Sequence, residues 1–274
     1  MPSFNDLFYE YYLQAYPQDF HLKDQLRYYV VKHRMTKELL EYIQRTWKKI
    51  LTICDVWAGF GYDDTLFKKV VKHYYPDVEI QVDIFDPELN FYKETTHTKQ
   101  EGISYYEQSF LTIDIPTYTN HYDVIICSEV VEHLRTSEQE VFFTNFNHIL
   151  KIGGMILLTT PNGSSMFKTI AGLLQRKKRQ TSLFEAEFNH RYAHIGVAPL
   201  FQLMGLFVRK WFELQKIYPA TRLSSTRFSQ INIVLNTLFR ICVWVNLFFS
   251  TDILWIAEKK RWMDTTKRYN TFSL

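Results

Sequence analysis

Two acids and two glycines, placed at the ends of apolar runs, are the first residues that could do chemistry. Residues 55–61 read Asp-Val-Trp-Ala-Gly-Phe-Gly and follow the apolar run 50–54. Gly59 and Gly61 let the main chain approach a ligand and present N–H groups where a helix starts. Asp86 ends the next apolar run, where a carboxylate can bind both hydroxyls of a ribose. This pattern indicates a nucleoside-containing cofactor; the alternative is an ordinary turn with a capping aspartate.

The spacing of the glycines narrows the choice of cofactor. A dinucleotide site has a third glycine three residues beyond the second, and Asp64 stands there in this chain. An acid at a helix start would repel a pyrophosphate. A cationic or zwitterionic ligand without phosphates suits this loop better, and S-adenosylmethionine is such a ligand.

Alternating strand and helix patterns would position these residues. Strand-like runs separated by helix-length segments predict a parallel sheet with helices on both faces. In such sheets the ligand lies outside the carboxyl ends of the strands, where the acids stand. Strands are predicted over residues 50–55, 80–85, 103–106, 122–128, 155–160, 207–217 and 253–259.

Helical patterns flank and separate the strands. The first 47 residues form a helical lead-in, in which Thr36 is expected to cap a second helix. Ser137 and Glu140 form a capping-box pattern at the start of another helix. Further helices are predicted over residues 199–207 and 231–249.

Three segments resemble motifs of the class I S-adenosylmethionine-dependent methyltransferases. Residues 55–61 look like the Asp-x-Gly-x-Gly-x-Gly loop, 122–134 resemble the fourth-strand motif and 150–162 the fifth-strand signature. The resemblance implies an α/β, doubly wound Rossmann-like fold, with a mostly parallel seven-stranded sheet, helices on both faces and a helical cap. It divides the chain into a helical lead-in (1–47), a cofactor-binding core (48–163), a substrate cap and insertion with remaining core elements (164–252), and a final strand with a polar tail (253–274).

The resemblance also assigns cofactor contacts residue by residue. The aminocarboxypropyl end of S-adenosylmethionine would be held by Asp55, Ala58, Gly59 and Gly61, and the ribose by Asp86. The adenine would be flanked by Ser109 and Phe110, while Ser128 and Glu129 would face the methionine part and the opening to substrate.

Trp57 departs from the family, whose loop has a glycine there that packs against the cofactor. Three explanations compete. The loop is shifted so that the ring points into the sheet, the chain is a non-catalytic member that binds a partner, or the tryptophan is an introduced substitution that blocks the cofactor. Trp57 is therefore counted with the cofactor loop, and the three explanations stay open.

Methyl transfer to a hydroxyl needs in-line placement of the acceptor and a general base. His133, with Glu132 beside it, follows the predicted fourth strand and is the candidate catalytic group, because imidazole titrates near neutral pH. The alternative role for His133 is a helix cap or a hydrogen bond to a loop carbonyl.

A metal-assisted alternative uses some of the same residues. Glu129, Glu132 and His133, with His190 or His194, resemble the metal-binding set of small-RNA 2′-O-methyltransferases. That family has a denser histidine pattern downstream, and metal-free quinone and glycan O-methyltransferases also carry Glu-His-Leu after strand four. We therefore expect no metal.

Two segments raise the question of a membrane. The basic run 176–179 and the apolar helix 231–249, which carries one polar stripe, would suit peripheral contact with a membrane and a lipid-linked acceptor. Polar residues within 231–249 argue against a spanning helix. We favour the plainer interpretation, a solvated loop and a core helix of the cap.

Bulk properties set further limits. The net charge of +3 is too small to indicate a nucleic-acid partner. Cys54, Cys127 and Cys242 are odd in number and far apart, and no signal peptide precedes them, so we expect a cytoplasmic protein without disulfides. The sequence therefore predicts S-adenosylmethionine-dependent O-methylation of a small molecule or glycan. The rival is a catalytically silent methyltransferase-like binding protein.

Overall fold

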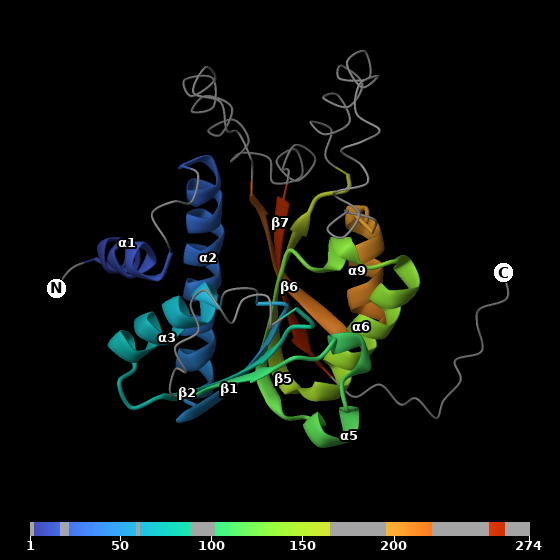
Figure 1. Cartoon of the computed structure of the whole chain (residues 1–274), viewed down its shortest axis with the longest axis horizontal. Coiled ribbons are helices and arrows are strands. Elements are labelled where there is room, and N and C mark those ends of the chain that lie inside the picture. The colour runs from blue at the N-terminus through green and yellow to red at the C-terminus, as the bar shows by residue number, and fades with distance from the viewer. Residues whose placement is uncertain are drawn as a thin grey trace, which may run out of the picture.

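The strands form one sheet of seven. The computed structural model describes residues 3–16, 22–58, 61–88, 102–164, 196–220 and 252–260. The strands are β1 (Ile50–Val56), β2 (Glu79–Phe85), β3 (Ile103–Tyr106), β4 (Tyr122–Ser128), β5 (Leu150–Pro161), β6 (Phe212–Ala220) and β7 (Asp252–Lys259). Their order is β3-β2-β1-β4-β5-β7-β6, parallel from β3 to β5, with β7 antiparallel to both of its neighbours (Figure 1). The predicted, mostly parallel doubly wound sheet is confirmed.

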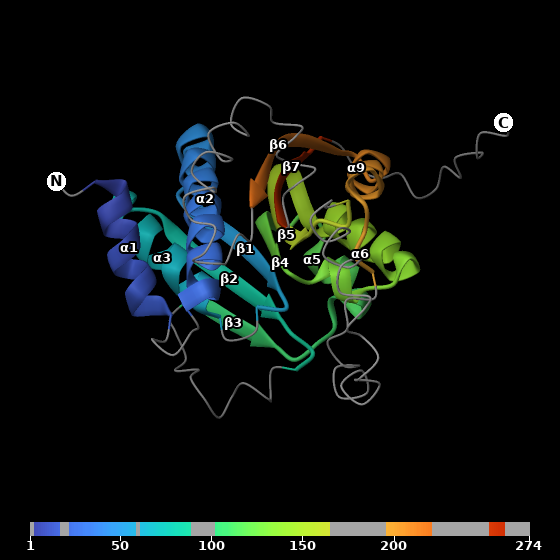
Figure 2. The same ribbon diagram turned by 90° about the horizontal axis from the view of Figure 1, so that it is seen from above.

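Helices cover both faces of this sheet (Figure 2). On one side are α1 (Phe4–Ala15), α2 (Leu22–Thr46) and α3 (Tyr62–Tyr74). On the other are α5 (Ile115–Tyr118), α6 (Thr136–Ile149) and α9 (Leu200–Arg209). Two short 3₁₀ turns, η1 (Phe110–Thr112) and η2 (Val131–His133), follow β3 and β4. The helix expected over 199–207 is confirmed, and α1 and α2 give helical structure to the described part of the first 47 residues.

Strand β4 shows why the core has two layers. Successive side chains of a strand point to opposite faces. Val124 and Ile126 therefore pack in the layer under α2 and α3, while Ile125 and Cys127 pack in the layer under α6 and α9. All four are fully buried, so β4 reads as a continuous apolar run, as central parallel strands do.

Two predicted helix caps are wrong. Thr36 lies inside α2, and its hydroxyl donates to the carbonyl of Lys32 at 2.7 Å, because a threonine inside a helix can satisfy its hydroxyl one turn back. The N-cap of helix α6 is Arg135, two residues before the proposed cap Ser137. There the carboxylate of Glu138 accepts the N–H of Arg135 at 2.7 Å.

The predicted strand over 207–217 begins late. Helix α9 continues to Arg209, and the chain then turns through Trp211 at φ +64° before β6 starts. The apolar face of α9 runs directly into the apolar start of β6, so hydrophobicity alone could not separate the two elements.

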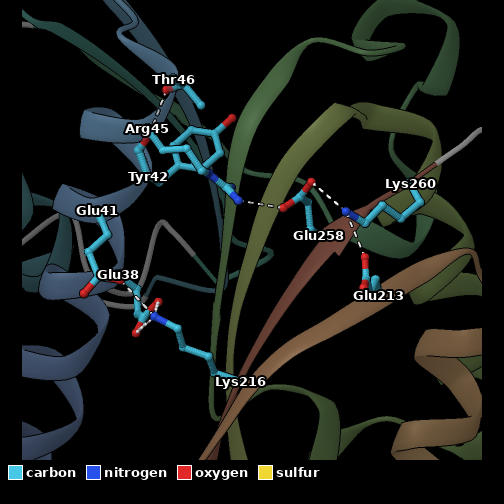
Figure 3. Close-up of polar contacts among 9 residues, drawn as sticks. All are labelled: Glu38, Glu41, Tyr42, Arg45, Thr46, Glu213, Lys216, Glu258 and Lys260. Atoms are coloured by element: carbon cyan, nitrogen blue, oxygen red, sulfur yellow. Dashed lines mark hydrogen bonds and ion pairs between the residues drawn. The ribbon is translucent and has the colours of Figure 1, made fainter.

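Helix α2 is fixed against the β6–β7 edge of the sheet by ion pairs (Figure 3). Lys216 Nζ lies 2.9 Å from a carboxylate oxygen of Glu38 and 2.9 Å from one of Glu41. The hydroxyl of Tyr218 also donates to Glu38, at 2.7 Å. Farther along the helix, Arg45 pairs with Glu258 of β7 at 3.0 Å. The lead-in helix is therefore joined to the last strands of the fold.

Several predictions fall outside the described residues, namely those on Gly59, residues 176–179, His190, His194, residues 231–249 and Cys242. Within the described part of the chain, no helix is both long enough and apolar enough to cross a membrane.

Candidate active site

The acids and polar residues predicted for the site meet at one edge of the sheet. Val56, near the end of β1, pairs with Phe85 of β2 on one side and with Cys127 of β4 on the other. The residues that follow those partners, Asp86 and Ser128, therefore flank the loop after β1. Asp86 is 4% exposed, and its carboxylate accepts the N–H of Glu88 at 2.8 Å, while Asp55 is 2% exposed.

The described residues on the two sides of the loop after β1 lie close together. Gly61 has φ +65°, and its N–H donates to the carbonyl of Ala58 at 3.1 Å. Trp57 also has a positive φ, +57°, while its N–H donates to the carbonyl of Phe85 at 2.8 Å. A left-handed conformation costs a residue with a Cβ roughly 1–2 kcal/mol, so the tryptophan occupies a backbone position suited to glycine.

The indole of Trp57 is half-buried and packs against the hydrophobic layer under α6 and α9. Its ring centroid lies 6.5 Å from that of His133, with the planes inclined by 38°. Among the described residues, its buried indole N–H has no hydrogen-bond partner. This placement favours the explanation in which the ring turns toward the sheet.

A buried pair of acids lies under the loop. Asp55 and Asp64, at the end of β1 and in the first turn of α3, are 2% and 1% exposed. Burial and the nearby carboxylate of Asp63 raise the pKa of Asp64 to about 7. Burial and the neighbouring Asp64 raise the pKa of Asp55 well above its usual value. The site therefore has an excess of acid in a dry environment, which favours a cationic ligand.

Lys32 of α2 supplies the opposite charge. Its ammonium forms an ion pair with Asp63 and lies 2.9 Å from the hydroxyl oxygen of Ser128. The hydroxyl of Tyr16, just after α1, also donates to Asp63. Sequence reasoning missed Lys32. The available signal was its helical spacing with Met35, on the stripe of α2 that faces the sheet.

His133 and Glu132 lie in η2, directly after β4. His133 is half-buried beside Trp57, whereas Glu132 is fully buried beneath the turn. The carboxylate of Glu132 accepts the hydroxyl of Thr160 at 3.1 Å, and its carbonyl accepts the N–H of Gly196 at 2.8 Å. Glu132 thus ties η2 to the end of β5, and His133 is the member of the pair that faces the loop.

Glu129, between β4 and η2, has φ +58°, and its N–H donates to the carbonyl of Thr159 at 3.0 Å. After β3, the hydroxyl of Ser109 accepts the N–H of Leu111 at 3.3 Å and caps η1. Phe110 is fully buried, with its ring 5.0 Å from that of Phe142. The ring of Phe110 packs in the core, so an adenine would contact Ser109 and the backbone of this turn.

Among the described residues, no group of three or more histidines, cysteines or acids is placed to hold a metal ion. The histidines of the metal-assisted alternative, His190 and His194, lie outside that part of the chain. A surface cavity of about 700 Å³ lies beside α3 and the β2–β3 edge, lined by Lys68, Lys72 and Ile80 among others. None of the assigned site residues lines it.

Residues 31–210 match the family model described as a methyltransferase domain. The chain therefore belongs to this family and is an S-adenosylmethionine-dependent methyltransferase. The residues present suit that cofactor, because the buried acids would oppose its sulfonium and ammonium charges and the carboxylate of Asp86, at the end of β2, could accept the hydroxyls of a ribose. No curated protein sequence matches the chain significantly.

Solved structures share the fold at low sequence identity. An S-adenosylmethionine-dependent methyltransferase from Mesorhizobium loti aligns with a TM-score of 0.54 and 11% identity, over 84% of this chain and 98% of its own. Magnesium protoporphyrin IX methyltransferase from Synechocystis aligns with a TM-score of 0.53 and 12% identity, over 93% of this chain and 96% of its own. The CurJ carbon methyltransferase aligns with a TM-score of 0.54 and 12% identity, over 84% of this chain and 54% of its own. These likenesses show the fold and leave the acceptor open.

Proposed function

We propose that this methyltransferase O-methylates a hydroxyl of a small molecule or glycan, with His133 as the general base. The observation that carries the proposal is the half-buried imidazole of His133, which lies beside Trp57 at the carboxyl end of β4. A neutral hydroxyl is a weak nucleophile, and an imidazole beside it can accept its proton as it attacks.

Each site residue has a role in this proposal. Bound S-adenosylmethionine supplies a methyl group activated by a sulfonium. Asp55 and Asp64 oppose its positive charges, and Asp86 binds the ribose hydroxyls. His133 accepts the proton of the acceptor hydroxyl. Glu132 acts as a positioning residue, because its buried contact with Thr160 holds the turn that carries His133.

A screen of acceptors tests the reaction type. Wild-type protein would be incubated with S-adenosylmethionine labelled in the methyl group and with glycans, lipid-linked glycans, phenols and quinone precursors, beside amine and carbon acceptors. We expect transfer to oxygen. Transfer confined to amines or carbon would overturn O-methylation.

Substitution of His133 tests the base. His133→Ala should lower kcat by about 100-fold or more while the affinity for S-adenosylmethionine changes little. His121→Ala is the matched control, because His121 is exposed at the amino end of β4, at the opposite edge of the sheet. Unchanged turnover in His133→Ala would remove His133 as the base.

Trp57 has a left-handed backbone in the cofactor loop, and a loop blocked by its indole would leave the protein catalytically silent. Calorimetric titration with S-adenosylmethionine separates an open site from a blocked one. Binding by the wild-type protein supports the enzyme. Binding by Trp57→Gly alone would indicate a blocked site, and no binding by either form would overturn the enzyme proposal.

A further inference from the structure

The buried lysine of α2 has a role beyond that of a counter-ion. Lys32 is 2% exposed, pairs with Asp63 at the start of α3 and reaches Ser128 at the end of β4. Asp63 belongs to α3, which follows the loop after β1, and Ser128 ends β4, which pairs with β1. The lysine thus enters the site from a helix outside the strand–loop–helix unit, and a buried ammonium is stable only where its surroundings match its charge.

The charged side chains around the loop after β1 match both the ammonium and the carboxylate of an amino acid. The buried acids Asp55 and Asp64 suit an ammonium and a sulfonium, as their raised pKa values in the free protein indicate. A carboxylate on the same ligand would be repelled by these acids and needs a cation of its own. Lys32 is a cation placed among them, beside the loop assigned to the aminocarboxypropyl end.

Ser128 completes the arrangement. Its hydroxyl oxygen accepts a hydrogen bond from the ammonium of Lys32 at 2.9 Å, which leaves its own O–H to donate to a ligand. Two donors would then face one carboxylate, and charge-assisted hydrogen bonds of this kind are the strong ones.

The lysine is held in place by its helix. Its carbonyl accepts the hydroxyl of Thr36. The next turn carries Glu38, which is bound to Lys216 (Figure 3) and also to Tyr218 of β6. The helix that carries Lys32 is therefore fixed in place before a ligand binds, which favours affinity.

We propose that Lys32, with Ser128, binds the α-carboxylate of the cofactor and so selects for the intact amino-acid end of S-adenosylmethionine. The proposal rests on the proposed function only in that both require the cofactor at this edge of the sheet.

Decarboxylated S-adenosylmethionine is the matched probe, because it keeps the sulfonium, the ammonium and the adenosine and lacks only the carboxylate. Calorimetric titration should show that wild-type protein prefers S-adenosylmethionine by about 10- to 100-fold. Lys32→Met should reduce that preference to less than about 3-fold, mainly by weakening S-adenosylmethionine. Lys49→Met, an exposed lysine next to β1, should keep it.

The outcomes are distinct. Equal weakening of both ligands in Lys32→Met would show that the lysine only maintains the shape of the site, and would overturn the proposal. A wild-type preference below about 3-fold would also overturn it, and this measurement needs no variant to fold. Wild-type protein that binds neither ligand would overturn the proposed function as well, whereas binding without preference would overturn the carboxylate assignment alone.

Discussion

The imidazole of His133 and the indole of Trp57 lie side by side where β4 and β1 end, with their ring centroids 6.5 Å apart. Trp57 reaches this position from a left-handed backbone conformation, at φ +57°. Backbone strain of this kind persists where surrounding contacts hold it, and it gathers at functional sites. The packing of the indole against the core layer under α6 provides such contacts.

Two substitutions of Trp57 separate backbone strain from ring packing. Trp57→Gly and Trp57→Ala lose the same indole, but only glycine relaxes at φ +57°. The glycine variant should therefore be more stable than the alanine variant by about 1 kcal/mol, measured by urea unfolding.

The neighbouring Ala58 is the control, because its φ is not positive. At that position Ala58→Gly should lower the free energy of unfolding by about 0.5–1 kcal/mol, so alanine is the more stable residue at 58 and glycine is the more stable residue at 57. Equal stability of the two Trp57 variants would show that this loop carries no strain.

The acid pair sets a pH dependence of stability. Burial and Asp63 raise the pKa of Asp64 to about 7 in the folded protein, against 3.8 for an ordinary aspartate. The folded protein therefore binds more protons than the unfolded chain between these values. Stability from Asp64 is fully present below about pH 4 and is lost as pH rises through 7, on the order of 1 kcal/mol per pH unit.

Asp64→Asn should flatten this slope between pH 4 and 7 in urea unfolding, and Asp77→Asn, at an exposed turn, should leave it unchanged.

A cationic ligand lowers the pKa of nearby acids. S-adenosylmethionine should therefore bind more tightly as pH rises toward 7 and release protons, seen by calorimetry in buffers of different ionisation enthalpy. Proton uptake would contradict the acid pair as part of the cofactor site.

Asp123 should matter for stability and not for the cofactor. It is fully buried at the amino end of β4; burial opposes its charge, but the N–H of Thr52 with Lys48 and Lys151 holds its pKa below the usual value. Asp123→Asn should destabilise the protein by about 1–3 kcal/mol, an effect lost as pH falls below 3.8. Weaker S-adenosylmethionine binding by the folded variant would contradict this separation.

The two glutamates that share Lys216 form a matched pair. The side chain of Glu38 is 7% exposed and that of Glu41 is 60% exposed. Glu38→Gln should lower the free energy of unfolding by about 1–2 kcal/mol and Glu41→Gln by less than about 0.5 kcal/mol, with only the second effect removed by salt. Similar losses for both would mean that burial does not decide the strength of this contact.

The sheet was predictable because its central strand β4 is buried on both faces and the strands around it are separated by helix-length segments. The predicted bounds of β3 and β4 are those of the structure, since Ile103–Tyr106 and Tyr122–Ser128 are bounded by clear polar signals. The caps of α2 and α6 were not, because α2 begins well before Thr36, and because Thr136, Ser137 and Glu138 all stand near the start of α6, where only tertiary packing selects among them.

The acids of the site were also predictable, because Asp55 and Asp86 stand at strand ends and all parallel strands end at one edge. Lys32 was not predicted, because its helix lies outside every motif and reaches the site only through packing across the sheet. The left-handed backbone of Trp57 agrees with the glycine that the family loop has there. The direction of its ring depends on His133 and the core layer, which sequence alone does not place.

Calorimetric titration of the wild-type chain with S-adenosylmethionine measures whether the acids at this edge of the sheet form a cofactor site. We expect saturable binding at one site, with a dissociation constant within the ~1 μM–1 mM range of enzyme–substrate affinities. Asp86→Ala should weaken that binding, because the ribose would lose its carboxylate partner. No saturable binding by the wild-type protein would show that this edge of the sheet does not bind S-adenosylmethionine, whatever the variants do.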